Sequence, residues 1–494
     1  MDITLLFLTV FIAGTLFLVG SKIERHFIFF LIRTKHLLNL IDYIANIAPK
    51  FWKFLADFAI IFSFSGLGVA YLSRYRRLNR NLDIIFGIMG IFAIALWWQN
   101  IVLAVVLLIL LIIVIYFLSS WERVWVDFLF SAGLITMIFI KVSSIILAAL
   151  GIERQIPLYI SMIEGVFGIP PLLIMLFLGN AYQIVFQSSK TPGVSPMIPA
   201  VQEGELGVAF PGYPELFVPL VYALIAIVVV LVSHEFAHGI LTRVYRIKLK
   251  STGLLTFGIL PIGAFVEPDE KEMEKRPSIE KMHIFSMGSF ANVLVCILAV
   301  ILILSIPLFV IEYDTGLVIA SINETSMASG ILKEGMIIYR INGEELNNVY
   351  KFVEIINKST PGDELLISTD QGEFRVKTIS KPENPEQAYL GLEVHSNIKC
   401  KYGIGLGSVL FIIDVLKWII FFNFNIALVN LLPIVPFDGW RMLRELMLTF
   451  NISEINARKI VQGIVAVTIF LFLVNILPLI GMIIEYIGNL LGCS

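Results

Sequence analysis

Charged residues are scarce in this sequence. Only 15% of its 494 residues are charged and 58% are hydrophobic, whereas a soluble globular protein has about 25% charged residues. A chain with so few charges cannot cover a surface that faces water, so we expect the lipid bilayer to be its main solvent. Uncharged runs such as 101–118 and 293–310 are long enough, as helices, to approach the roughly 30 Å hydrocarbon core. The composition therefore predicts a multi-span membrane protein.

Cysteine and clustered basic residues are also scarce. The three cysteines, Cys296, Cys400 and Cys493, are far apart and show neither metal-ligand spacing nor a disulfide framework. No basic tract suggests nucleic acid as a partner, and the net charge is −2. The first apolar segment lacks a preceding basic region and a small-residue cleavage signature, so we expect a retained span rather than a signal peptide.

Ten apolar segments have the length and composition of membrane spans. They centre on 3–20, 54–72, 83–98, 101–119, 126–150, 169–187, 216–240, 284–311, 404–432 and 460–488. Residues 22–53 mix charged and apolar side chains, which predicts an interfacial amphipathic stretch. The sequence thus predicts a polytopic α-helical membrane protein with about ten transmembrane helices.

Two polar stretches interrupt the apolar pattern. Residues 188–215 are rich in Pro, Gly and Ser and predict a loop outside the lipid. Residues 314–400 hold many charges, short β-like runs and turn signals, which predict a small water-exposed α+β domain. Lys and Arg residues concentrate in 243–250, 271–281 and 441–459. Because such residues favour cytoplasmic loops, we expect the 314–400 domain on the opposite, extracytoplasmic side.

A five-residue motif lies near the end of the 216–240 segment and reads His234-Glu235-Phe236-Ala237-His238. On a helix, positions i and i+4 lie on one face, with Cβ atoms about 5–6 Å apart. His234 and His238 can therefore direct imidazole nitrogens at one zinc ion, while Glu235 can act as a base on zinc-bound water. A chance match is the alternative. Because a charge at the bilayer centre costs about 2.5–3.5 kcal/mol, a functional site is favoured.

A catalytic zinc site needs a third protein ligand and an open position. Asp438 is the best candidate, because it ends an apolar run in which two prolines and a glycine break the helix. Irregular backbone at membrane depth is tolerated only inside protein or beside a wet cavity, so the Asp438 carboxylate can turn inward to a metal. The alternatives are Asp438 as a helix cap at the membrane surface, and His283 as a different ligand.

The pairing of the HExxH motif with the run N-x-x-P-x-x-P-x-D-G at 430–439 resembles the site-2 protease family of intramembrane zinc metalloproteases. The run 258–267 resembles the short membrane-embedded β region of this family, and 288–292 resembles its glycine-to-asparagine run. Residues 316–379 look like an inserted PDZ domain, with its carboxylate-binding loop at 316–319. The resemblance covers about residues 216–450, and the extra N-terminal spans resemble the eukaryotic-type members.

This resemblance implies a metalloendopeptidase that cuts within or near the transmembrane segments of single-span membrane proteins. It implies zinc held by His234, His238 and Asp438, with Glu235 as the catalytic base. It also implies a set of substrate-binding residues, namely Asn292, Gly263, Gly316, Leu317 and Val318. A second set is expected to support the turn at Asp438, namely Asn430, Pro433, Pro436 and Gly439. The PDZ-like domain is expected to bind a peptide C-terminus or to gate access.

The domain organisation expected from these patterns has six parts. They are an N-terminal membrane bundle (1–187), an extracytoplasmic loop (188–215), a first part of the catalytic membrane core (216–313), the PDZ-like extracytoplasmic domain (314–400), a second part of the core (401–450) and C-terminal membrane helices (451–494). The active site is expected toward the cytoplasmic side.

Two other functions remain open from the sequence. A membrane-anchored zincin cutting at the cytosolic face would take its third ligand from a downstream glutamate, and Glu270, Glu272, Glu274 and Glu280 are available. A non-catalytic PDZ scaffold with structural zinc would need a fourth protein ligand, and the sequence offers no clear candidate.

Overall fold

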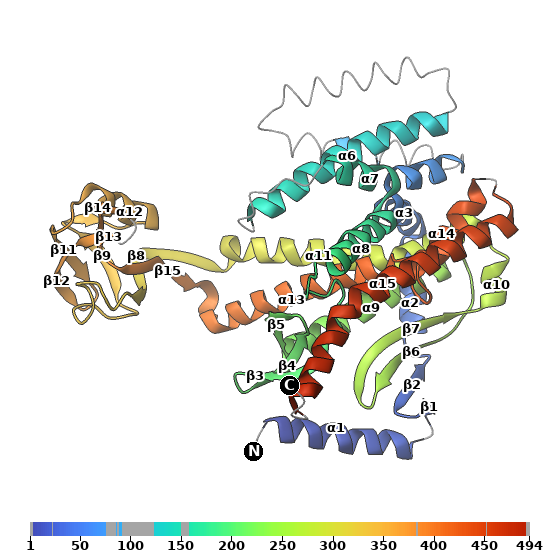
Figure 1. Ribbon diagram of the computed structural model, residues 1–494, viewed down its shortest axis with the longest axis horizontal. Coiled ribbons are helices and arrows are strands. Elements are labelled where there is room, and N and C mark those ends of the chain that lie inside the picture. The colour runs from blue at the N-terminus through green and yellow to red at the C-terminus, as the bar shows by residue number, and fades with distance from the viewer. Residues whose placement is uncertain are drawn as a thin grey trace. The chain divides into compact units, whose positions relative to one another are not determined.

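The computed structural model describes residues 3–21, 23–75, 85, 88–90, 123–149, 158–381, 384–450 and 452–490. The chain divides into two compact units (Figure 1). The first comprises Met1–Ala299 and Val415–Ser494, and the second comprises Val300–Asp414. The metal-binding motif and Asp438 both belong to the first unit.

Helices dominate the first unit. In chain order they are α1 (Ile3–Gly20), α2 (Leu38–Ile47), α3 (Pro49–Ser73), α6 (Arg123–Ala149), α7 (Leu158–Phe167), α8 (Ile169–Phe186), α9 (Leu220–Val244), α10 (Glu270–Glu274), α11 (Ser278–Phe309), α13 (Leu406–Asn430), α14 (Asp438–Thr449) and α15 (Glu454–Leu490), with α11 and α13 extending into the second unit.

Six of the described helices, namely α3, α8, α9, α11, α13 and α15, are long and apolar enough to cross a membrane. They indicate a multi-pass membrane protein, as the composition predicted. The predicted span 101–119 lies outside the described residues, and so does nearly all of 83–98. The predicted spans 3–20 and 126–150 correspond to α1 and α6, which are not among the six. The described helices do not support the count of about ten spans, which stays a prediction.

One hydrophobic core joins several helices around the metal-binding motif. Buried side chains of α3, α9, α11 and α14 pack together in it, among them Tyr71, Leu241, Met282 and Met442. Since apolar side chains gain little by leaving lipid for protein, helix association in membranes depends on close packing and interhelical hydrogen bonds. A polar link of this kind is the pair of hydrogen bonds that Arg243 of α9 donates to the Asp42 carboxylate of α2.

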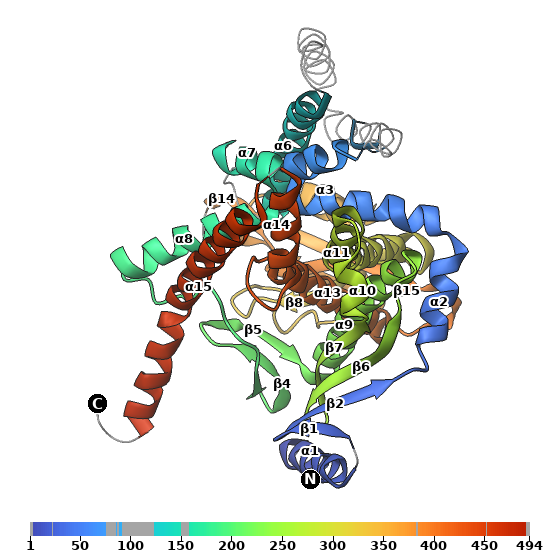
Figure 2. The same ribbon diagram turned by 90° about the vertical axis from the view of Figure 1, so that its right-hand side faces the viewer.

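A four-stranded antiparallel sheet lies beside α9 (Figure 2). Its strands are β1 (Glu24–His26), β2 (Phe29–Thr34), β6 (Leu249–Phe257) and β7 (Leu260–Pro268), in the order β1-β2-β6-β7. The expected β region is therefore larger than a short hairpin. In the stretch 22–53, expected to be amphipathic and interfacial, β2 pairs with β6 along its whole length. The interfacial position stays a prediction.

The stretch expected as a loop over 188–215 also contains strands. β3 (Ile198–Gln202), β4 (Glu205–Phe210) and β5 (Tyr213–Pro219) form an antiparallel meander. Glycines with positive φ, Gly204 and Gly212, lie in its two turns, where residues with a Cβ are strained. The meander contacts the start of α9, so this stretch is folded rather than irregular.

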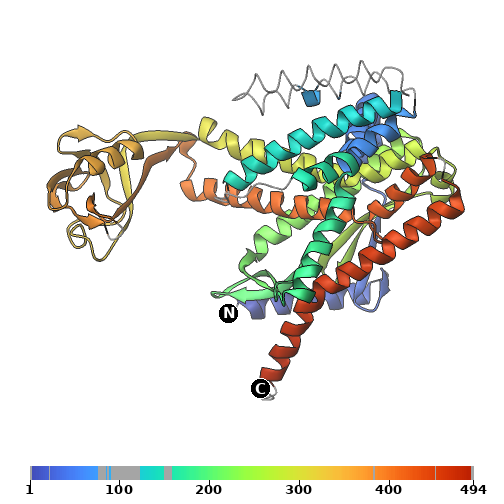
Figure 3. The ribbon, with the colours of Figure 1, turned by 45° about the horizontal axis from the view of Figure 1, so that its top comes forward.

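The second unit is built around an antiparallel sheet (Figure 3). Its elements are β8 (Ile311–Ile322), β9 (Ile337–Ile341), β10 (Glu344–Glu345), α12 (Val349–Lys358), β11 (Glu364–Thr369), β12 (Gly372–Lys377), β13 (Ile379–Lys381), β14 (Asn384–Tyr389) and β15 (Leu392–Cys400). The sheet order is β12-β11-β9-β8-β15, with β10 paired to β9 and β13 paired to β14. Apolar side chains of α12 and the sheet share one core, which confirms the expected α+β domain.

Candidate metal centre

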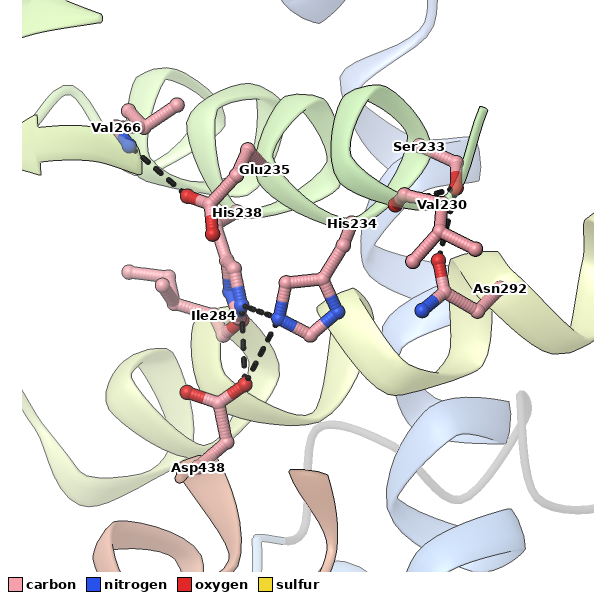
Figure 4. Close-up of polar contacts among 9 residues, drawn as sticks. All are labelled: Val230, Ser233, His234, Glu235, His238, Val266, Ile284, Asn292 and Asp438. Atoms are coloured by element: carbon pink, nitrogen blue, oxygen red, sulfur yellow. Dashed lines mark hydrogen bonds and ion pairs between the residues drawn. The ribbon is translucent and has the colours of Figure 1, made fainter. Parts of the chain in front are cut away.

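The two histidines of the motif lie on one face of α9. Their Nε2 atoms are 3.1 Å apart, and the close-up in Figure 4 shows both imidazoles directed to the same point. This arrangement follows from the i, i+4 spacing of His234 and His238 in a continuous helix. Both side chains are largely buried, with 10% and 14% of their areas exposed.

Asp438 completes the cluster from a distant part of the sequence. α13 ends at Asn430 and α14 begins at Asp438, so the proline-containing linker turns the chain and brings this carboxylate to α9. The Asp438 Oδ2 atom lies 3.1 Å from Nε2 of His238 and 3.3 Å from Nε2 of His234. Gly439 is required for the turn, since a Cβ there would lie 2.3 Å from the Leu431 carbonyl oxygen.

These three donor atoms fit a zinc ion. Zinc bonds to nitrogen and oxygen of about 2.0–2.1 Å, arranged tetrahedrally, place neighbouring ligand atoms roughly 3.3 Å apart. The observed separations of 3.1–3.3 Å match this spacing. Two imidazoles and a carboxylate are also a donor set found in zinc enzymes. Among the described residues, the ligand atoms of His234, His238 and Asp438 form a group in which all lie within 4.8 Å of one another.

Glu235 lies next to the ligands but is held differently. Its Oε2 atom accepts a hydrogen bond of 2.9 Å from the Val266 backbone N–H of β7. This bond fixes one carboxylate oxygen on the strand beside α9 (Figure 4). Glu235 is outside the group whose atoms can share one metal ion, as expected for a base rather than a ligand.

A cavity of about 410 Å³ opens onto this cluster. Its walls come from α9, β7, α11 and the start of α14, and its lining includes all three ligands together with Glu235, Ala264, Phe265, Val266, Asn430 and Arg441. The site therefore has room for water and for a peptide segment beside the ligand atoms.

Two features of α11 shape the metal centre. The Ile284 carbonyl accepts a hydrogen bond of 2.7 Å from Nδ1 of His238, which leaves Nε2 of that ring for a metal. Gly288 lets the α11 backbone approach closely, because a Cβ there would lie 2.3 Å from Nε2 of His238. The resemblance drew attention to Gly288, but nothing in the sequence indicated Ile284, because a backbone carbonyl carries no residue-type signal.

Asn292 lies one turn beyond Gly288 on α11 and is fully buried. Its Oδ1 atom accepts a hydrogen bond of 2.8 Å from the Ser233 hydroxyl. Its Nδ2 atom is buried and has no hydrogen-bond partner among the described residues. Asn292 does not line the cavity described above, so its expected contact with substrate stays a prediction.

The remaining residues expected in the membrane core lie close to the cavity. Gly263 is on β7, opposite Leu255 of β6, and does not line the cavity itself. Asn430 is the last residue of α13 and lines the cavity, as does Pro436. Pro433 is buried in the same linker.

The expectation that Gly316, Leu317 and Val318 bind a peptide end stays a prediction. Leu317 and Val318 lie on β8, paired with β9 on one side and with β15 on the other. Gly316 lines a surface cleft of about 400 Å³ within this unit. The strand at the end of the sheet on this side is β15.

The alternative ligands considered for the sequence are not at the site. His283 is directed away and bonds to Asp57. Glu270, Glu272, Glu274 and Glu280 lie in α10 and at the start of α11, and none joins the group of metal-ligating atoms among the described residues. A fourth protein ligand is likewise missing from that group, as an open catalytic site requires.

Arg441 was missed as a site residue, because its charge was counted only as a cytoplasmic signal. It lines the cavity, and its guanidinium carbon lies 5.4 Å from the centroid of the Phe285 ring. The position i+3 from Asp438 on a helix could have indicated it, since such residues share a face.

Comparisons with known proteins agree with this geometry. A chain with several membrane-crossing helices and a His-His-Asp site is a membrane metalloprotein. Residues 222–475, just over half of the chain, match peptidase family M50, and the chain belongs to this family. The uncharacterized protein MJ0971 of Methanocaldococcus jannaschii is 31% identical over 236 residues, which are 47% of this chain and 59% of that protein. The chain thus spans about three fifths of that relative.

Some solved structures resemble a small part of the chain. The PDZ domains of SdrC-like proteins from Listeria innocua and Listeria monocytogenes are 23% and 20% identical to it. Each match covers 17% of this chain, and 96% and 90% of the respective domain, with a TM-score of 0.16 in both cases.

Proposed function

We propose that this protein is an intramembrane zinc metalloprotease that hydrolyses peptide bonds within or near transmembrane segments of single-span membrane proteins. The observation that carries the proposal is the convergence of His234, His238 and Asp438 on one point, with Glu235 beside them. Donor atoms 3.1–3.3 Å apart and a cavity of about 410 Å³ supply the metal site and the space for the reaction. Membership of peptidase family M50 supports the same chemistry.

The three ligands would hold the zinc ion and leave one position open. When bound, zinc lowers the pKa of water toward about 7 and polarises a carbonyl group. Glu235 supplies the proton transfer, with one carboxylate oxygen fixed by the Val266 N–H. Its other oxygen takes a proton from the attacking water and delivers it to the leaving amine.

The outer edge of β7 is the proposed binding site for the substrate backbone. β7 ends the sheet, and residues 264–266 line the cavity. The Val266 N–H points away from β6, because it donates to Glu235. A substrate helix must unwind before its peptide bonds can be cut, and its freed backbone groups then need partners. Strand addition along β7, past Gly263, would supply them.

Asn292 is proposed to stabilise the substrate carbonyl through its unpartnered Nδ2 atom. Because Asn292 is buried behind the cavity lining, this role requires a side-chain movement on substrate binding. Asn430, Pro433, Pro436 and Gly439 are proposed to hold the turn that presents Asp438.

The 314–400 domain is proposed to lie outside the cytoplasm, with the active site toward the cytoplasmic side, as the distribution of Lys and Arg indicates. We expect it to exclude bulky substrates or to bind a peptide C-terminus. In the second case the peptide end would bind at Gly316, Leu317 and Val318, where Gly316 lines a surface cleft.

Trapping with a Glu235→Gln variant tests the proposed function. The variant is expected to bind zinc as the wild type does and to accumulate uncut single-span membrane proteins, which cross-linking and mass spectrometry identify. A cytosolic zincin would instead accumulate soluble proteins, and a scaffold would bind the same partners with or without the Glu235 carboxylate. A wild-type protein that binds no zinc would rule out all three.

A further inference from the structure

A second buried histidine cluster lies on α11, away from the metal centre. His283 is 2% exposed and Asp57 of α3 is fully buried. Nε2 of His283 lies 2.9 Å from Oδ1 of Asp57, and Nδ1 lies 2.5 Å from the Tyr245 hydroxyl at the end of α9. The cluster therefore joins α3, α9 and α11 at one point.

The donors and acceptors of these two bonds are compatible with a neutral His283 ring. The Asp57 carboxylate accepts from Nε2–H of His283, and Nδ1 of the neutral ring accepts from the Tyr245 hydroxyl. Buried polar groups are stable only when they are satisfied in this way. Both bonds run through His283, so its removal would break the links to Asp57 and to Tyr245 together.

The residue after His283 touches the metal centre directly. The Ile284 carbonyl accepts the hydrogen bond of 2.7 Å from Nδ1 of His238. This bond determines which ring nitrogen carries the proton and how the ring is turned, so it presents Nε2 to the metal. The position of one backbone carbonyl on α11 thus controls one zinc ligand.

The other histidine ligand lacks such support. Nδ1 of His234 is buried and has no hydrogen-bond partner among the described residues. Of the two ligand rings, only that of His238 has a hydrogen-bond partner at Nδ1 among the described residues.

We propose that His283, held by Asp57 and Tyr245, is a positioning residue for the metal centre. It anchors α11 so that the Ile284 carbonyl meets Nδ1 of His238. Asp57 lies on α3, outside the residues 222–475 that match the family, so the N-terminal helices contribute to the site. This inference rests on the proposed zinc site and adds a structural requirement to it.

The test measures zinc affinity and the absorption spectrum of the cobalt-substituted protein in the full chain. His283→Leu removes both ring nitrogens and is expected to weaken zinc binding about tenfold, the lower end of the range for outer-shell partners of zinc ligands. The cobalt bands, which report ligand geometry, are expected to shift. His283→Gln retains an N–H donor for Asp57 and is expected to restore most of the affinity.

Asn475→Leu provides a matched control. Asn475 is a fully buried polar residue of α15 that bonds to Asn180 and to the Phe177 carbonyl of α8, so its loss also breaks an interhelical link. It is expected to lower the unfolding temperature without changing zinc affinity or the cobalt spectrum.

Wild-type zinc affinity and cobalt bands in a folded His283→Leu protein would overturn the inference. So would equal changes in His283→Leu and Asn475→Leu. If His283→Leu does not fold, Tyr245→Phe, which deletes one oxygen, decides the question: unchanged affinity and bands refute the positioning role, and weakened binding with shifted bands supports it. Absence of zinc from the wild type would instead refute the proposed function.

Discussion

The first unit contains two buried histidine–aspartate clusters with different chemical consequences. In one, His234, His238 and Asp438 direct their donor atoms at a common point beside a cavity. In the other, both ring nitrogens of His283 are engaged by Asp57 and Tyr245. Neither His283 nor Asp57 lines a cavity identified among the described residues.

This difference shows that residue type and burial do not define a metal site. A metal ion needs several donor atoms with free lone pairs and a position open to water. The His283 cluster uses its donors and acceptors to bind helices together instead. Substitutions that remove one property of the metal centre at a time should separate the two clusters experimentally.

The largest effect is expected for removal of Asp438, the carboxylate ligand of the metal centre. Asp438→Ala should weaken zinc binding by more than about 100-fold, since even outer-shell partners account for 10–100-fold. Zinc content after purification and competition with a chelator measure this loss. Asp314→Ala, which removes a partly exposed carboxylate of the second unit that pairs with Lys399, should leave zinc content unchanged. A zinc-replete, active Asp438→Ala protein would refute the ligand assignment.

The next effect concerns the base that only the metal centre has. Glu235→Gln should reduce the cleavage rate by about 10²–10⁴, the usual contribution of general acid–base catalysis. Zinc stoichiometry should stay at the wild-type value, because Glu235 is not among the ligands. Cleavage of a transmembrane peptide and zinc content are measured on the same preparation.

Glu267→Gln is the control for this prediction. Glu267 lies on the same strand as Val266 but bonds to the Ser251 hydroxyl, so its loss should have little effect on cleavage. If Glu235→Gln lost its zinc, Glu235 would have a structural role instead.

The third prediction concerns the close packing of α11 against His238 at Gly288. Gly288→Ala would place a Cβ 2.3 Å from Nε2 of His238, and overpacking of this kind costs about 1–3 kcal/mol. Zinc affinity should fall about tenfold, which corresponds to about 1.4 kcal/mol. Titration with zinc measures the change. Gly463→Ala on α15, where the new Cβ would meet no described atom within 4 Å, should bind zinc normally, and equal affinities in both variants would contradict the packing argument.

The smallest effect is expected for a change at the free edge of β7, where the substrate backbone is proposed to bind. The N–H of Ala264 lies two residues before that of Val266, so it also points away from β6. Ala264→Pro removes this donor and should raise KM about threefold to tenfold, the contribution of one hydrogen bond. Ala264→Ser, which keeps the N–H, should retain the wild-type KM. A higher KM in both variants would show that the side chain at position 264, rather than its N–H group, affects substrate binding.

The helical half of the metal centre could be predicted from local spacing alone. His234 and His238 share a helix face because they are one turn apart, and the surrounding apolar run places them in a span. The helix break before Asp438 was also visible, because prolines and a glycine interrupt an apolar segment. The contact between Asp438 and the histidines, 200 residues apart, was expected only through resemblance to a family.

Pairings between distant segments could not be predicted, because they depend on which backbone edges and polar groups remain free after folding. Residues 29–34 form a strand because their backbone groups hydrogen-bond to β6. The same holds for the second unit, where β15 pairs with β8 and ends the sheet. His283 is a possible ligand by sequence, but its ring bonds to Asp57, which is 226 residues away.

The sequence by itself determined that the chain lies in a membrane, where the spans around the motif lie and which two histidines are metal ligands, since these follow from composition and from neighbours within about one helical turn. Only the tertiary structure decided which carboxylate meets the histidines, which strand edge faces the cavity and which carbonyl orients His238. These depend on contacts between helices and strands far apart in the chain, and local side-chain patterns carry little information about such contacts.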